Sequence, residues 1–238
     1  MSDGELIAVI VAVSVTLAAL TPVVARWRRR RRTRERLATY AHERGLELVE
    51  EQLPEVTPIL YAGSERVTRL ALKGELSEER DGTIAHYTYV EQVPVGGGRG
   101  SAFSSTSFDL TVVLVEVPDA VGVFPKLLCH GRRGAENTDR IDDALGRKGL
   151  KRLKLESTAL NRRFELFYAP DQDEVRLRRL FAPALIVWLA ESMPTAFELV
   201  DSHLCCFAAG HLDSTVELDG LVWGAAELAW RLEAEATE

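Results

Sequence analysis

Histidine and cysteine side chains gather near the carboxyl end of the chain, where they could ligate a metal ion. His203 is followed by Cys205 and Cys206, and His211 lies a little further on. In a strand, alternate side chains share a face, so His203 and Cys205 point one way and Cys206 the other. No Cys-x-x-Cys pair completes a four-ligand set. We therefore expect no metal ion and three reduced, structural cysteines, the third being Cys129 beside His130.

A glycine-rich stretch, Gly96–Gly100, is the one candidate for phosphate binding. Phosphate loops connect a strand to a helix and carry a Lys-Ser/Thr pair or Gly-x-Gly-x-x-Gly spacing. Here a serine-rich stretch and another predicted strand follow instead. We expect a long flexible hairpin loop from residue 95 to residue 107 and no bound cofactor.

Nucleophilic catalysis has little support in the sequence. No Gly-x-Ser-x-Gly motif occurs, and the run His211, Asp213, Ser214 is better explained by a turn, because sequence neighbours seldom form a triad. We expect no catalytic residues. The densest polar cluster at a junction between predicted elements is the candidate for any functional site, through anion binding or simple ion pairing; it comprises Glu156, Asn161, Arg162 and Arg163.

Leu6 to Ala25 is a run of twenty residues without a charge. As a helix it spans about 30 Å, the thickness of the hydrocarbon core of a bilayer. A cleaved signal peptide is the alternative, but acidic residues precede the run and arginines follow it, which favours a retained anchor. The sequence thus predicts an extracytoplasmic segment 1–5, a transmembrane helix 6–25, a polybasic segment 26–36 and a cytoplasmic domain 37–238 in the cell membrane.

The arginines after the apolar run fix this orientation and lie where anionic lipid headgroups would contact them. The predicted lipid contacts are Arg26, Arg28, Arg29, Arg30, Arg31 and Arg32. From Leu37 onward the chain has 21 basic and 33 acidic residues, a formal net charge of −12. Such a domain is not expected to bind nucleic acid.

Hydrophobic periodicity predicts an α+β domain with a largely antiparallel sheet and flanking helices. We expect a helix over 33–43 ended by Gly45, a helix over 172–193 that Pro183 bends or splits, and a last helix over 216–234. The expected strands cover 46–49, 67–76, 84–93, 108–117 and 164–169, with a hairpin over 196–208 that turns at Asp201-Ser202-His203.

An ordered series in the second half, Glu156-Ser157, Asn161-Arg162-Arg163-Phe164, a strand and a helix with Pro183, resembles a family of membrane-associated actinobacterial proteins of unknown function. Gly74 and the strand with Tyr87 and Tyr89 fit the family as well. The chain departs from its pattern at Leu160, where the family has an aromatic residue, and at Ala184, where it has arginine. The resemblance implies one domain near a membrane and assigns no chemistry.

These observations predict a membrane-tethered, non-catalytic binding or interaction module with an unknown protein partner. The alternative is an enzyme that acts on a small or lipid-derived substrate at the inner face. A deep pocket with polar groups around Glu156 and Arg162 would favour the enzyme, and a shallow surface with an exposed apolar patch the interaction module. Self-association through the span and its neighbouring helix is a third possibility.

Overall fold

The computed structural model describes residues 28, 31–77, 80–95, 102–131, 147, 149–191 and 196–237. The chain divides after Tyr40 into two compact units, of which the second, Ala41–Glu238, contains every strand described. Within the described part of the chain, no helix combines the length and apolar character that a membrane crossing requires. The predicted span 6–25 and the glycine-rich run 96–100 lie outside the described residues, as do Arg26, Arg29 and Arg30.

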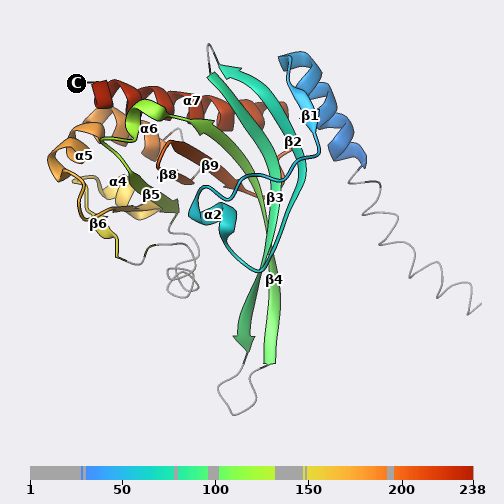
Figure 1. Ribbon diagram of the computed structural model, residues 1–238, viewed down its shortest axis with the longest axis horizontal. Helices are drawn as coiled ribbons and strands as arrows, with labels where there is room; N and C mark the ends of the chain where they lie inside the picture. The colour runs from blue at the N-terminus through green and yellow to red at the C-terminus, as the bar shows by residue number, and fades with distance from the viewer. Residues whose placement is uncertain are drawn as a thin grey trace, which may run out of the picture. The chain divides into compact units, whose positions relative to one another are not determined.

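Among the described residues nine strands form one sheet, and all eight pairs of neighbouring strands are antiparallel (Figure 1). The order is β1-β2-β3-β4-β9-β8-β5-β7-β6. The predicted α+β class with a large antiparallel sheet is therefore confirmed. The strand bounds are β1 Glu47–Val49, β2 Glu65–Ser77, β3 Arg80–Val95, β4 Ala102–Glu116, β5 Lys126–Gly131, β6 Lys151–Leu153, β7 Phe164–Tyr168, β8 Ala196–Val200 and β9 His203–Ala209.

Residues 31–44 are helical, and Gly45 ends this helix as predicted. Gly45 has a φ of +68°, a conformation that glycine adopts without strain, and the Leu46 N–H donates to Ala41 O at 2.8 Å. The other helices are α2 Pro58–Tyr61, the 3-10 turn η1 Pro118–Ala120, α4 Thr158–Arg163, α5 Glu174–Leu180, α6 Pro183–Glu191 and α7 Thr215–Thr237.

Pro183 does split the predicted long helix, because it begins α6 three residues after α5 ends at Leu180. The hairpin β8–β9 also turns where expected, with Asp201 at a φ of +51°. The prediction of a flexible loop from 95 to 107 was wrong in its described part. There β3 and β4 stay paired out to Val95 opposite Ala102, well beyond the ends of β2 and β9.

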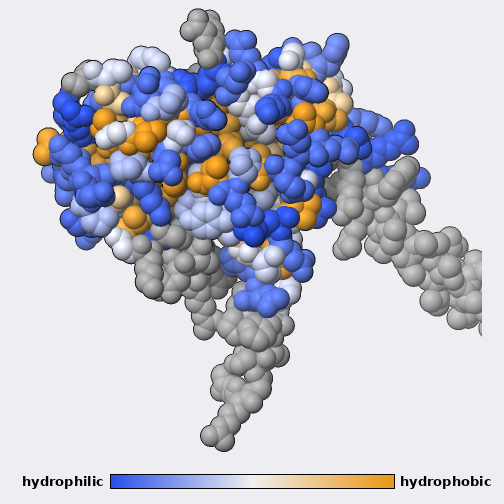
Figure 2. All heavy atoms as spheres, in the orientation of Figure 1, coloured by the Kyte–Doolittle hydropathy of each residue, from blue (hydrophilic) through white to orange (hydrophobic). Residues whose placement is uncertain are grey.

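The two faces of the sheet differ in what covers them. The long helix α7 lies across one face and contacts β2, β4 and β9 (Figure 1). On the other face, Ala71, Ala85 and Val112 stand in register and pack with α2. The short helix α2 and the loop before it leave part of this second face open. A space-filling view shows hydrophobic residues there, broken up by hydrophilic ones (Figure 2).

Candidate binding groove on the open face of the sheet

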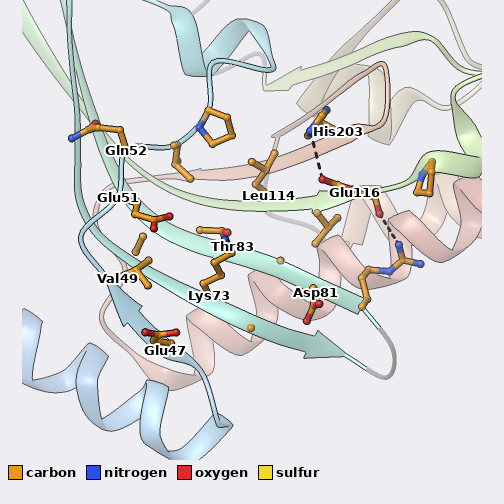
Figure 3. A pocket seen from close by; sticks show the side chains of 18 of the residues that line it. Glu47, Val49, Glu51, Gln52, Lys73, Asp81, Thr83, Leu114, Glu116 and His203 are labelled. Carbon is orange, nitrogen blue, oxygen red and sulfur yellow. Dashed lines mark hydrogen bonds and ion pairs between the residues drawn. The ribbon is translucent and has the colours of Figure 1, made fainter.

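A groove of about 900 Å³ lies on the open face, between β1 with its following loop and the ends of β3 and β4 (Figure 3). Its floor is apolar or small, formed by Ala71, Thr83 and Leu114 with the backbone of Gly82. A Cβ atom at Gly82 would lie 2.8 Å from Leu114 O, so only glycine fits this crossing of strands. Five carboxylates line the walls: Glu47, Glu51, Asp81, Glu116 and Glu233.

Few basic groups offset these carboxylates. Arg80 donates to Glu233 through its two terminal guanidinium nitrogens, at 3.1 Å and 2.5 Å, and also to the backbone oxygen of Glu116 at 2.9 Å. Arg80 therefore links the end of α7 to the end of β4 through hydrogen bonds, and its charge is paired with Glu233. Lys73, which stands opposite Glu47 in the strand register, is the other lysine or arginine of the groove.

Glu51 and Asp81 are exposed, and neither side chain has a hydrogen-bond or ion-pair partner among the described residues. With His203 neutral, the lining side chains carry a net charge of −3. Because the walls are acidic and the floor is apolar, the groove favours a cationic ligand with an aliphatic part. No group of three or more histidine, cysteine or acidic side chains suited to a metal ion occurs among the described residues.

The loop after β1 forms one wall of the groove. It is held to β2 by hydrogen bonds that involve side chains, in place of the backbone pairs of a sheet. Gln52 Oε1 accepts from the Thr68 N–H at 2.9 Å, and Thr68 Oγ1 accepts from the Leu53 N–H at 2.9 Å. Thr68 stands at a register shift in the pairing of β2 with β3. The bulge thus presents its backbone and hydroxyl to the loop rather than to another strand.

A buried polar network holds the start of α2, the helix that follows this loop. Glu198 is fully buried on β8, and its Oε2 accepts from the Ile59 N–H at the start of α2, at 2.8 Å. Its Oε1 lies 2.8 Å from His130 Nε2, while Arg147 donates to His130 Nδ1. A guanidinium only donates, so the imidazole proton lies on Nε2. Arg147 also stacks on Phe167, 4.6 Å from the ring centroid.

The side chains of this network are buried and hydrogen-bond to one another. Its three side chains are at most 6% exposed, and none lines the groove. The arrangement places one buried carboxylate against one buried guanidinium with a neutral ring between them, which a protein tolerates because each hydrogen-bonding group has a partner. We therefore interpret it as the support that fixes α2 and the groove wall, not as a reaction centre. Sequence reasoning missed it, since Glu198, His130 and Arg147 are far apart in the chain.

The polar cluster predicted from the sequence is not part of the groove. Ser157 caps α4 by accepting from the Leu160 N–H, and Asn161 Nδ2 donates to Leu155 O at 2.6 Å. Arg163 binds Ala190 O on α6, while Glu156 and Arg162 are exposed. These side chains therefore hold α4 in place and gather around no common cavity that the structure shows. His203 does line the groove, but the neighbouring cysteines are buried free thiols.

Two stacked histidines, His86 on β3 and His211 in the segment after β9, lie outside the groove. Their ring centroids are 4.6 Å apart, and His86 Nε2 donates to Leu212 O at 2.7 Å. The pKa of His86 is lowered to about 4, mainly by burial and also by the neighbouring His211, which together outweigh the opposing effects of the Leu212 carbonyl, Asp213 and Asp109. The pair therefore serves to hold the segment 209–214 on the sheet.

The lowered pKa of His86 predicts that acid destabilises the protein. Because the unfolded chain binds the proton more readily, stability is complete above about pH 6.5 and falls as the pH drops toward 4. The loss reaches up to about 3 kcal/mol. His86→Gln, which can still donate to Leu212 O, is expected to remove this part of the pH dependence. Urea unfolding at pH 7 and pH 5 checks it, and an unchanged pH slope in the variant would contradict the assignment.

No protein-family model, curated protein or solved structure matches the chain.

Proposed function

We propose that residues 41–238 form a non-catalytic binding module whose acidic groove holds a linear, lysine- or arginine-rich segment of a partner protein. The observation that carries the proposal is the excess of carboxylates around an apolar floor, of which Glu51 and Asp81 have no partner among the described residues. Long basic side chains suit such a site, because their aliphatic stems cover the floor while their charged ends reach the carboxylates. The distribution of charge, more than the area of the groove, sets the class of ligand.

The proposal includes the membrane anchor that the sequence predicts. A module tethered at the inner face would meet basic segments frequently, since the cytoplasmic flanks of membrane proteins are enriched in lysine and arginine. Tethering also raises the effective concentration of the two partners, so a groove of modest affinity suffices. The partner we propose is thus another membrane protein with a basic segment next to its span.

The alternative enzyme has one geometric feature in its favour. Ser202 Oγ lies 3.4 Å from His203 Nδ1, and His203 Nε2 lies 4.0 Å from Glu116 Oε1. Both distances exceed the 2.6–3.2 Å typical of a working general base. Adjacent residues in a hairpin turn also present their side chains in different directions. The groove therefore supports binding better than hydrolysis.

Peptide titration of the full chain in detergent micelles tests the proposal. A peptide with the sequence of residues 26–36 serves as the basic probe, and an acidic peptide of equal length serves as the control. We expect the basic peptide to bind and its affinity to fall steeply between about 50 and 500 mM salt, because exposed charges are screened. Absence of binding at low salt, or equal binding of both peptides, would refute the proposed function.

A further inference from the structure

The outer face of α7 carries large apolar side chains that the domain does not cover. Val216 is 81% exposed, Trp223 55% and Trp230 60%. Residues three or four apart share one face of a helix, and this face reads Val216, Gly220, Trp223, Glu227, Trp230, Ala234. Its one charge, Glu227, is half-buried and paired with Arg231 at 2.7 Å. Exposed tryptophans in a continuous stripe are typical of a contact surface.

Gly220 leaves a hollow in this stripe, one turn before Trp223. An added Cβ atom at Gly220 would meet nothing within 4 Å, so the position opens outward and the domain itself does not require glycine there. Glycine inside a helix costs about 1 kcal/mol relative to alanine. Small residues on a helix surface let a second helix approach closely. The hollow is therefore an observation, separate from the exposure of the tryptophans, that points to a packed partner.

We propose that this face is the interface of a homodimer, in which α7 packs antiparallel against α7 of a second copy. A two-fold axis that passes at the level of Ala225 pairs each residue of the stripe with a residue of the stripe on the other copy. It sets Trp230 of each copy over the Gly220 hollow of the other, and Val216 against Ala234. The same register brings the indole N–H of Trp223, a hydrogen-bond donor, to the Glu227 carboxylate of the other copy. A two-fold interface requires this kind of self-complementarity.

Charge argues for a second copy over a lipid surface. The sides of α7 carry Glu217, Asp219, Glu233 and Glu235, and Arg231 is its one basic residue. Anionic headgroups would repel such a helix. Trp188 of α6 extends the patch, because its ring meets the Trp223 ring edge-on with centroids 5.7 Å apart. The contact area of one helix pair is small, so we expect a weak dimer. Tethering to a membrane would raise the local concentration of the chain and favour such a dimer.

Sedimentation equilibrium of the full chain in mild detergent tests the dimer. We expect concentration-dependent dimers that weaken about ten-fold or more in Trp230→Ala and in Gly220→Leu. Gly220→Leu is the sharper variant, because leucine fills the hollow yet has the higher helix propensity, so its thermal midpoint should not fall. Gly122→Leu, at an exposed glycine with open space around it, is the matched control and should dimerise like the wild type.

Three results would overturn the proposal. The first is a wild-type chain that stays monomeric at every concentration. The second is a dimer that Gly220→Leu and Trp230→Ala leave unchanged, as expected if the predicted span alone pairs the copies. The third comes from liposomes of brominated phosphatidylcholine: quenching that a Trp230→Phe variant reduces would show that lipid covers this face. Trp230 fluorescence that brominated lipid does not quench supports the dimer.

Discussion

Glu198→Ala is expected to destabilise the domain by about 3–5 kcal/mol. The substitution removes the acceptors for the Ile59 N–H and for His130 Nε2, both of which lie within the protein interior. Because a domain of this size has a total stability of only about 5–15 kcal/mol, the loss is a large fraction of it. Urea unfolding of the full chain in detergent measures the change.

Two further variants make this result specific to the buried network. Glu165→Ala removes a partly exposed carboxylate that pairs with Arg152 at 2.8 Å, and we expect it to cost about 1 kcal/mol or less. Glu198→Gln keeps the shape and an acceptor for Ile59 but removes the charge, so its stability should fall between those of the wild type and Glu198→Ala. If Glu198→Ala were no worse than Glu165→Ala, the network would not be the support that we describe.

Reversing two charges of the groove is expected to have the largest effect on binding. Glu51→Lys with Asp81→Lys should weaken binding of the basic peptide by about ten-fold or more for each reversed charge at physiological salt. Both side chains are exposed and lack partners among the described residues, so the fold should be unaffected. The far-ultraviolet circular dichroism and the thermal midpoint of the double variant check that it is folded.

The matched control carries the same change in net charge at a distance from the groove. Glu156→Lys with Asp171→Lys alters two exposed acidic residues, neither of which lines the groove. We expect this variant to bind the basic peptide within about two-fold of the wild type at physiological salt, because charges farther apart than a Debye length of about 8 Å are screened. Equal losses in the two double variants would mean that net charge alone drives binding.

Local patterns predicted the elements of this fold well. Turn signals, β-branched and aromatic composition and, for β4, alternation predicted the strands found as β2, β3, β4 and β7, and Pro183 predicted the break between α5 and α6. Each of these signals depends on neighbours in the sequence. The strand β5 was missed, because Lys126–Gly131 is buried among other strands and shows little alternation, with four buried residues in a row.

The candidate site could not be predicted in the same way. Glu47, Asp81 and Glu116 come together only through the order of strands β1 to β4, and the network of Glu198, His130 and Arg147 only through the pairing of β5 with β8. The density of polar residues from Glu156 to Arg163 was a poor guide to the site, because this cluster mainly caps α4 and holds it in place. Exposed carboxylates are common in any acidic domain, and only their register shows which of them share a groove.

Photo-crosslinking of the basic peptide to the full chain tests the central claim most directly, because it reports where the ligand lies. A photoreactive group in the middle of the peptide is activated at low salt, and mass spectrometry locates the attachment sites. The account predicts attachment to the wall residues 49–54 and to the ends of β3 and β4 near Asp81 and Glu116, with loss of the product at high salt. Attachment mainly to the outer face of α7 or around Glu156, or no product from folded protein, would contradict it.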